Sequence, residues 1–246
     1  MNNHNELQIE SRNGICKIII NRPEKRNSLT PSILNALQFQ IEKLKKDKGI
    51  RCIVITGAGD KAFSSGFDIN SIGENDMLRD YDKNDPLINV MKAIEKYPYP
   101  VISMINGHAF GAALELAATC DIRICVDTAI LGMPPAKLGV VYSYSGIKKF
   151  INLIGLGNTK ELFLIGKTID AEKAKNIGFI NHLSSKNDLE KTTYDLASQI
   201  VENAPLSLRT MKKMINSWQN SHTLNTKDEE EIRTLLKKVQ ESSDYK

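Results

Sequence analysis

The stretch of sequence that decides the fold is VISMINGHAFGAALELAATCDIRICV, residues 101–126. It opens with a continuously apolar run at 101–105, which is typical of a strand buried on both faces. A glycine-bearing loop follows at 106–111, then a helix of small residues at 112–120 and another strand at 122–126. This alternation indicates an α/β domain whose sheets are covered by helices.

The residues before this stretch continue the same pattern. Residues 52–57 form a second short apolar strand that ends at a glycine, and the β-rich runs 7–10 and 15–20 flank ArgAsnGly, which predicts a hairpin. A helix begins with Thr30 as its N-cap and Pro31 at its first position. Its apolar residues recur at helical spacing: Ile33, Leu34, Leu37, Ile41 and Leu44.

Other segments are assigned from their local signals. Residues 58–86 are polar and predicted to be irregular, and a helix is predicted from about Pro86 to Lys96, stopped by TyrProTyrPro. Asp170 is the expected N-cap of a short helix that Gly178 ends.

The residue pattern of the C-terminal part of the chain differs from that of the rest. From about residue 187 the pattern is almost wholly helical, with a break near Pro205. We therefore divide the chain into an α/β core, residues 1–186, and a C-terminal helical region, residues 187–246.

Composition excludes several classes of protein. The chain has 246 residues, 41% of them hydrophobic, with no apolar run of membrane-spanning length and no signal-peptide layout at its N-terminus. We expect a cytoplasmic protein without a membrane partner. The net charge of +4 is mild and the basic residues are spread out, which argues against a nucleic-acid partner.

The metal-binding residue types form no cluster in the sequence. Cys16, Cys52, Cys120 and Cys125 each lie in or beside an apolar stretch, and no two of them make a C-x-x-C pair. We expect them to be small buried hydrophobic residues, and because the four histidines are scattered, we expect no metal site.

Two glycine-containing loops, 64–68 and 106–113, are candidates for chemistry. A glycine before a helix start allows a sharp turn and directs backbone N–H groups outward. Two such groups that converge on one point form an oxyanion hole. For either loop alone, a tight turn followed by Asp68 as a helix N-cap is the interpretation that most sequences of this kind favour.

Five segments together resemble the enoyl-CoA hydratase/isomerase (crotonase) family: NRPEKRNSLT (21–30), KAFSSGFDI (61–69), NGHAFGAALELAATCDIRI (106–124), LGMPPAKLGVVYSYSGIKKF (131–150) and ELFLIGKTIDAEKAKNIGFINHL (161–183). They cover most of the chain in the family's order. The resemblance implies a spiral of ββα units, with C-terminal helices at the interface of a homo-trimer or hexamer. It also implies an acyl-CoA substrate and no separate cofactor, since coenzyme A is part of the substrate.

The resemblance assigns the binding residues. It implies that the backbone N–H groups of Phe67 and Ala112 bind the thioester oxygen, and that the adenine lies against the main chain around Ser65. Lys25 and Arg26 would lie near the phosphates, although an exposed loop is their alternative interpretation. The remaining residues implied in substrate or coenzyme A binding are Ala62, Gly66, Gly111 and Pro135.

The catalytic side chains depart from the family pattern. Glu115 matches the first of the two carboxylates used by a hydratase, and its apolar neighbours suit proton transfer better than the alternative of an exposed helix glutamate. The second carboxylate falls at Pro135, which can neither accept nor donate a proton. The ordinary two-carboxylate hydratase mechanism is therefore not expected.

The methylmalonyl-CoA decarboxylase branch resembles this chain more closely at that point. Members of the branch carry the same proline, followed by a leucine–glycine–valine segment and a tyrosine, here Tyr142. Tyr142 would orient the carboxylate or donate a proton, unless it is an ordinary aromatic residue packing at a helix start. This chain departs from the branch at Phe67 and Pro134, where the decarboxylases carry a histidine and a threonine.

Three hypotheses follow. The first is a decarboxylase-like lyase that acts on a methylmalonyl-type CoA thioester. The second is an enoyl-CoA hydratase or Δ3-Δ2 isomerase that uses Glu115 alone. The third is a non-catalytic acyl-CoA-binding or RNA-binding relative.

Overall fold

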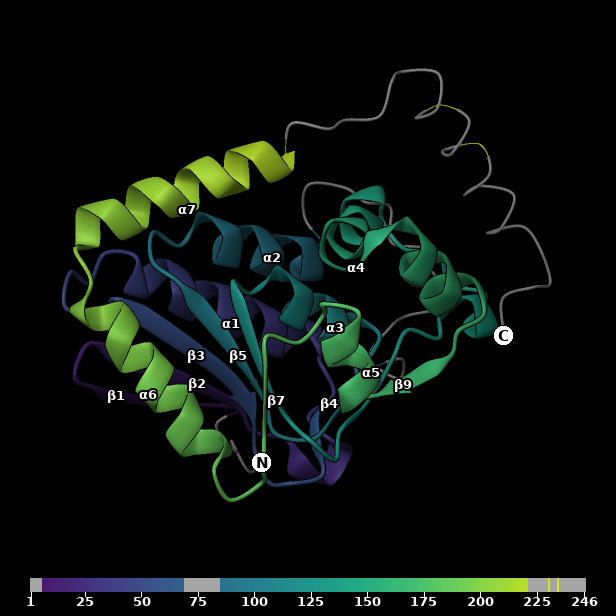
Figure 1. Cartoon of the computed structure of the whole chain (residues 1–246), viewed down its shortest axis with the longest axis horizontal. Helices are drawn as coiled ribbons and strands as arrows, with labels where there is room; N and C mark the ends of the chain where they lie inside the picture. The colour runs from purple at the N-terminus through teal and green to yellow at the C-terminus, as the bar shows by residue number, and fades with distance from the viewer. Residues whose placement is uncertain (1–5, 69–84, 221–229, 231–233, 235–246) are drawn as a thin grey trace.

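The computed structural model describes residues 6–68, 85–220, 230 and 234 of the chain (Figure 1). The strands in these residues are β1 (Leu7–Arg12), β2 (Ile15–Ile20), β3 (Cys52–Gly57), β4 (Ala62–Ser64), β5 (Val101–Ile105), β6 (His108–Phe110), β7 (Ile122–Val126), β8 (Ile130–Gly132), β9 (Thr168–Asp170) and β10 (His182–Ser184). The helices are α1 (Pro31–Leu44), α2 (Pro86–Lys96), α3 (Ala112–Thr119), α4 (Tyr144–Leu164), α5 (Ala171–Asn176), α6 (Leu189–Glu202) and α7 (Pro205–Asn220), with the 3-10 turns η1 (Pro23–Lys25) and η3 (Pro135–Leu138).

The strands form two sheets that the chain visits in turn. A six-stranded sheet has the order β1-β2-β3-β5-β7-β10, and a four-stranded sheet has the order β4-β6-β8-β9. Each of the pairs β3–β4, β5–β6 and β7–β8 places its first strand in the larger sheet and its second in the smaller, and a helix follows each pair. This is the spiral of ββα units that the family resemblance implies.

The predicted hairpin is present at the edge of the larger sheet. β1 pairs antiparallel with β2 from Leu7 opposite Ile20 to Arg12 opposite Ile15. The turn consists of Asn13 and Gly14, which both have positive φ (49° and 77°), as a two-residue hairpin turn requires. β1 is two residues longer than predicted.

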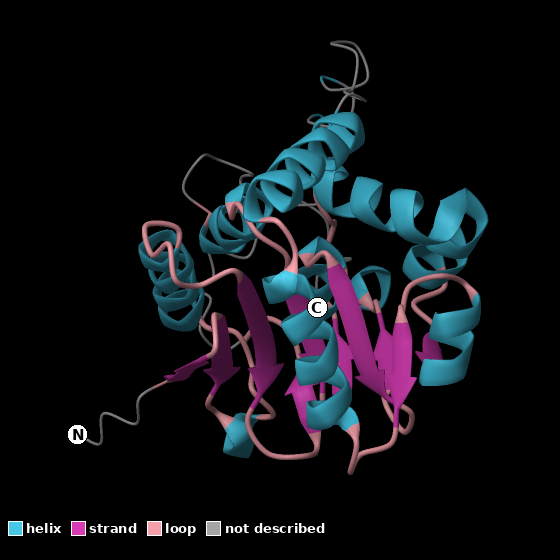
Figure 2. Cartoon of the chain, turned by 60° about the vertical axis from the view of Figure 1, so that its left-hand side comes forward, coloured by secondary structure: helices cyan, strands magenta, loops and turns pink. Residues whose placement is uncertain are grey.

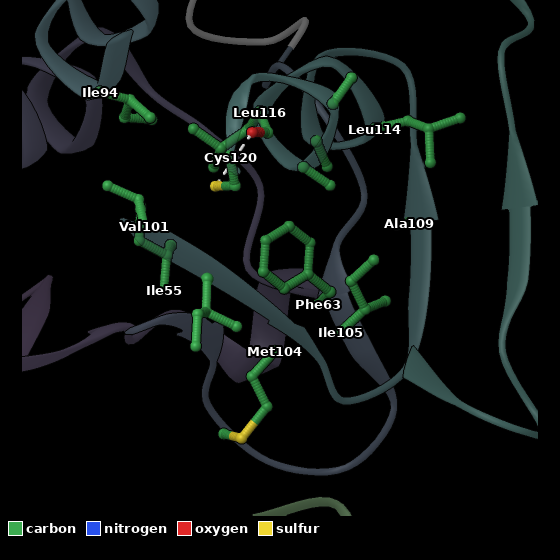
Figure 3. Close-up of a cluster of buried hydrophobic side chains, with 14 of the residues drawn as sticks. Ile55, Phe63, Ile94, Val101, Met104, Ile105, Ala109, Leu114, Leu116 and Cys120 are labelled. Carbon is green, nitrogen blue, oxygen red and sulfur yellow. Dashed lines mark hydrogen bonds between the residues drawn. The ribbon is translucent and has the colours of Figure 1, made fainter. Parts of the chain in front are cut away.

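The core lies between the sheets and the helices. Figure 3 shows Phe63 beneath α3, among apolar side chains from β3, α2, β5 and α3, and Phe63 is fully buried. The five apolar positions predicted for α1 are all buried too. Because Phe63 directly precedes the loop 64–68, the burial of this one side chain anchors the loop, a contribution of about 2 kcal/mol or more.

The structure corrects the prediction for residues 58–86. β4 lies within that stretch, although the stretch was expected to be irregular, and residues 69–84 lie outside the described part of the chain. The sequence also gave no separate prediction of β6, β8, β9 or β10. Three-residue strands are too short to show alternation, and these pair with strands distant in sequence.

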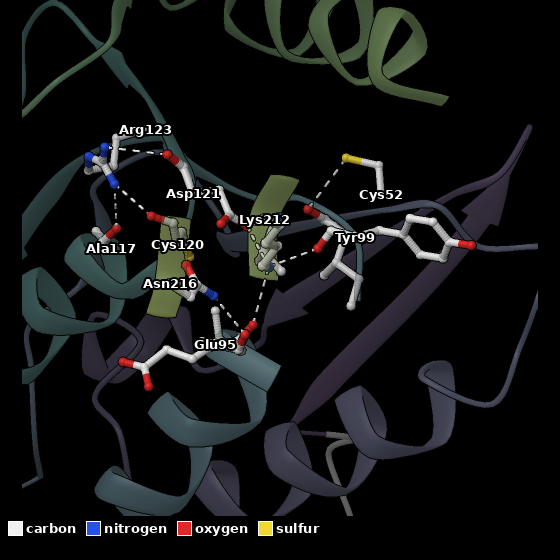
Figure 4. A network of polar contacts seen from close by, with 12 residues as sticks. Cys52, Glu95, Tyr99, Ala117, Cys120, Asp121, Arg123, Lys212 and Asn216 are labelled. Atoms are coloured by element: carbon white, nitrogen blue, oxygen red, sulfur yellow. Dashed lines mark hydrogen bonds and ion pairs between the residues drawn. The ribbon is translucent and has the colours of Figure 1, made fainter. Parts of the chain in front are cut away.

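The predicted C-terminal helices are present as far as they are described. α6 crosses one face of the larger sheet (Figures 1 and 2), and α7 begins at the predicted break, Pro205. The buried Lys212 ties α7 to the core: its Nζ donates to Tyr99 O at 2.9 Å and pairs with Asp121 at 2.7 Å (Figure 4). The boundary at residue 187 stays a prediction. No helix among the described residues is both long and apolar enough to cross a membrane.

Candidate functional site

Two loops meet where β4 and β6 end. Gly66 has φ +93°, a conformation that favours glycine. A methyl group on its α-carbon would lie 2.5 Å from Phe110 O and 3.4 Å from Ala112 N, so only glycine allows this approach. The contact brings the loop that carries Phe67 against the start of α3, where Ala112 lies.

The geometry of α3 leaves the backbone N–H group at its start without an acceptor inside the helix. Ala112 is the first residue of the helix, and the first N–H groups of an α-helix have no acceptor within that helix. Gly111 makes the turn into it with φ +54°, and its N–H donates to Gly132 O at 3.0 Å. The helix dipole adds partial positive charge here, so this place suits an oxygen that gains negative charge.

Backbone hydrogen bonds hold Phe67 in position. Leu29 N donates to Gly66 O at 2.8 Å and Asp68 N donates to Leu29 O at 2.9 Å, so the loop pairs with Leu29 on both sides of Phe67. These bonds fix the main chain and leave the Phe67 side chain only partly buried. A backbone donor at this position is therefore independent of the side chain.

A polar cluster that the sequence did not predict supports the same loop. Arg22 Nη1 pairs with Asp68 Oδ2 at 2.6 Å and donates to Ser28 Oγ at 2.9 Å, while Ser28 Oγ lies 3.2 Å from the same carboxylate oxygen. Arg22 and Ser28 lie in NRPEKRNSLT, which carried the family resemblance but gave no hint of this partner. Whether Asp68 also caps a helix concerns residues outside the described part.

The basic residues of the coenzyme A prediction lie beside this loop. Lys25 and Arg26 are exposed in and after η1, and Arg26 O accepts from Ser65 N at 2.9 Å. Asn27 Nδ2 donates to Ala62 O at 2.8 Å, which ties the turn to β4 as well. The structure thus brings the predicted Lys25, Arg26, Ala62 and Ser65 together, with two exposed cations available to phosphates.

Glu115 lies one turn along α3 from Ala112. It is 5% exposed, so the alternative of an exposed helix glutamate is wrong. Its carboxylate lies against the first turn of α4, because a methyl group on Gly146 would be 2.8 Å from Glu115 Oε1. Residues three apart on a helix share a face, so the side chain of Glu115 lies on the same side of α3 as that of Ala112, whose N–H group begins the helix.

Tyr142 reaches the same place from the segment before α4. A methyl group on Gly111 would lie 3.4 Å from its hydroxyl oxygen. Its half-buried ring packs edge-on against Phe163, with 5.6 Å between the ring centres. The ring therefore packs as the structural interpretation expects, and the hydroxyl lies beside the start of α3, while its catalytic role stays a prediction.

Pro135 is buried and begins η3. Its side chain is purely hydrocarbon, and its carbonyl accepts from Val140 N at 3.0 Å. It stabilises the turn that leads to Tyr142 and supplies no proton-transfer group.

The other end of α3 holds a buried cation that the sequence analysis missed. Arg123 donates to the carbonyls of Cys120 at 2.7 Å and Phe179 at 2.6 Å, and more distantly to Ala117 O (Figure 4). Burial lowers the pKa of this guanidinium. A cation at the C-terminus of a helix stabilises its free carbonyls, so Arg123 helps to hold α3 in place.

The four cysteines are free and buried, as predicted. Burial raises the pKa of Cys52, Cys120 and Cys125 to about 12. Among the described residues, no group of three or more His, Cys, Asp or Glu side chains could hold a metal ion.

Comparison with known proteins places these features in context. The profile of the family described as Enoyl-CoA hydratase/isomerase matches residues 10–246. The methylmalonyl-CoA decarboxylase of Escherichia coli is 32% identical over 242 residues, 97% of this chain and 91% of that protein. The short-chain-enoyl-CoA hydratase of Clostridium acetobutylicum is 31% identical over 212 residues, 86% of this chain and 81% of that protein. A solved methylmalonyl-CoA decarboxylase complexed with 2S-carboxypropyl CoA has a TM-score of 0.93 and 31% identity, covering 98% of this chain and 92% of that one.

Proposed function

The chain belongs to the enoyl-CoA hydratase/isomerase family, and we propose that it decarboxylates a methylmalonyl-type CoA thioester through an enolate. The observation that carries this proposal is the Tyr142 hydroxyl beside Gly111, at the start of α3, in a chain that has Pro135 in place of a second carboxylate. The similarity to methylmalonyl-CoA decarboxylase, whose solved complexes contain 2-nitronate-propionyl-CoA and 2S-carboxypropyl CoA, supports it over nearly the whole chain.

The reaction needs no base. The bond between the α-carbon and the carboxylate breaks, its electron pair moves into the thioester to form the enolate, and CO₂ leaves. The N–H groups of Phe67 and Ala112 donate to the enolate oxygen as its charge grows. One such donor contributes about 3 kcal/mol to the stability of the transition state.

The polar side chains act before and after that step. Tyr142 orients the leaving carboxylate by donating a hydrogen bond from its hydroxyl group, which holds the breaking bond in a reactive geometry. A proton then returns to the α-carbon, and Tyr142 and Glu115 are the nearby groups able to deliver it. The exposed Lys25 and Arg26 bind the phosphates of coenzyme A, and the main chain at Ser65 and Phe67 receives the adenine.

A second function is favoured by one observation. Glu115 is buried next to the oxyanion site, which is the environment of a working general acid or base. Enoyl-CoA hydration or Δ3-Δ2 isomerisation by this single carboxylate is the alternative, and the similarity to the Clostridium hydratase agrees with it.

Parallel turnover of methylmalonyl-CoA, crotonyl-CoA and a 3-enoyl-CoA tests the proposal. Release of CO₂ from the first thioester, with little reaction of the others, is expected. Rapid hydration of crotonyl-CoA or isomerisation of the 3-enoyl-CoA would contradict the decarboxylase assignment in favour of Glu115 chemistry. Binding of acyl-CoA without any turnover would indicate a non-catalytic relative.

We propose a homo-trimer or a hexamer as the assembly. α7 carries a stripe of apolar side chains, each more than half exposed, at helical spacing: Met211, Met214, Ile215 and Trp218. A stripe of this kind on the surface supports contact between copies of the chain. Sedimentation analysis that finds only monomers would overturn this assembly.

A further inference from the structure

The backbone conformation at Gly146 does not require a glycine. The residue lies in the first turn of α4, after the N-cap Ser143, whose Oγ accepts from Gly146 N at 3.0 Å. Gly146 does not have a positive φ. Alanine is a far better helix former than glycine, so local structure alone favours alanine at this position.

The reason for glycine lies across the helix interface. A methyl group on its α-carbon would be 2.8 Å from Glu115 Oε1, 3.1 Å from Glu115 Cδ and 3.1 Å from Oγ of the N-cap Ser143, so the shortest contact is with the carboxylate. A carbon and an oxygen that are not bonded do not approach so closely. The space that a side chain would fill at residue 146 is taken by the Glu115 carboxylate.

We propose that Gly146 is a positioning residue for Glu115: the missing side chain admits the carboxylate to the first turn of α4 and sets where it lies. The helix start also favours a carboxylate, because its partial charge is positive there. The catalytic meaning of this position rests on the proposed function.

The main chain of Glu115 leaves little room for adjustment. Its N–H donates to Gly111 O at 3.1 Å, its carbonyl accepts from Thr119 Oγ1 at 2.9 Å, and every residue of α3 is buried. A methyl group at residue 146 is therefore accommodated by rotation of the carboxylate or by movement of the first turn of α4.

Gly146→Ala is expected to lower kcat by about tenfold or more with little change in KM, since a displacement of about 1 Å can cost that much. The coenzyme A residues around Ser65 lie on other segments and are untouched. In a Glu115→Asp background, where the carboxylate is one methylene shorter, Gly146→Ala is expected to change kcat less than about twofold, because the contact with the carboxylate is already relieved and only that with Ser143 Oγ remains.

Gly157→Ala is the matched control. Gly157 lies in the same helix, and a methyl group on it would meet no atom within 4 Å among the described residues. We expect its kcat and KM to be those of the unchanged protein. Equal kcat values for Gly146→Ala and Gly157→Ala would overturn the proposal.

A stability cycle tests the contact without using activity. Gly146→Ala is made in the unchanged protein and in Glu115→Ala, and urea midpoints are compared. We expect a lower midpoint in the first background and an equal or higher one in the second. If the changes in urea midpoint caused by the two substitutions simply add, the contact itself is overturned. If they do not add, but the protein turns over no thioester, the contact is upheld and only the proposed function is overturned.

Discussion

Gly66 packs so closely against the end of β6 that a methyl group on its α-carbon would lie 2.5 Å from the carbonyl oxygen of Phe110, two residues before Ala112. The loop after β4 and the helix after β6 therefore form one unit, although they come from different ββα repeats. Anything that separates the two separates the proposed donors Phe67 and Ala112.

Gly66→Ala tests this unit. The methyl group would meet Phe110 O at 2.5 Å, so we expect the loop to move away from α3 and kcat to fall about 100-fold, the loss of one oxyanion donor. Gly59→Ala is the control: Gly59 also has positive φ, +76°, but among the described residues its methyl group would meet only Pro23 Cβ, at 3.6 Å. Both variants lose about 1–3 kcal/mol through backbone strain. Equal activities of the two variants would show that the contact with α3 does not matter.

Tyr142→Phe tests the hydroxyl that lies beside Gly111. The ring contact with Phe163 is kept, so we expect a folded protein that still unfolds cooperatively in urea and has a kcat about 100-fold lower. Tyr144→Phe removes a hydroxyl from a 39% exposed ring two residues away and serves as the control. If Tyr142→Phe has the kcat of the unchanged protein, the hydroxyl has no catalytic role and Tyr142 acts only through the packing of its ring.

Asp68→Asn tests the cluster behind the loop. The change weakens the contacts with Arg22 and Ser28, and we expect the free energy of unfolding to fall by about 2 kcal/mol, with weaker acyl-CoA binding as the loop loosens. Asp60→Asn removes an exposed partner of Lys186 and is expected to change the urea midpoint very little. If the two variants unfold at the same urea concentration, the cluster does not hold the loop.

The sequence was sufficient wherever the signal was local. Ile33 N donates to the predicted N-cap Thr30 at 3.1 Å, and Lys173 N donates to the predicted N-cap Asp170 at 2.7 Å. Cap chemistry acts within one turn, so it can be read from neighbouring residues. The apolar runs of β3, β5 and β7 are fixed by burial on both faces in the same way.

What the sequence did not reveal depends on residues that meet only in the fold. Arg22 and Asp68 contact each other across the β4 loop, and Gly146 faces Glu115 across two helices. Neither pair can be recognised in the sequence, because its two residues are not neighbours in the chain and do not recur at the period of a helix or strand. The family resemblance named the site residues, the structure brings Phe67, Ala112, Glu115 and Tyr142 together, and their roles stay predictions.

Alkaline pH tests the buried thiols. Burial raises the pKa of Cys52, Cys120 and Cys125 to about 12 in the native chain from the value of about 9 for an exposed thiol, so above pH 9 the unfolded chain loses protons that the native chain keeps. The contribution of these thiols to the free energy of unfolding is complete below pH 9. It falls as pH rises towards 12, by about 1.4 kcal/mol per pH unit for each thiol. Urea midpoints at pH 8 and pH 10 measure this, and iodoacetamide is expected to label the native thiols at pH 8 far more slowly than the unfolded ones. Equal labelling rates would contradict their burial.

The most direct test of the central claim is the mass of the acyl product formed from methylmalonyl-CoA in D₂O. Decarboxylation through an enolate predicts propionyl-CoA that carries one deuteron at its α-carbon, together with one CO₂ for each product molecule. Recovery of unchanged methylmalonyl-CoA from an enzyme preparation that hydrates crotonyl-CoA would contradict it.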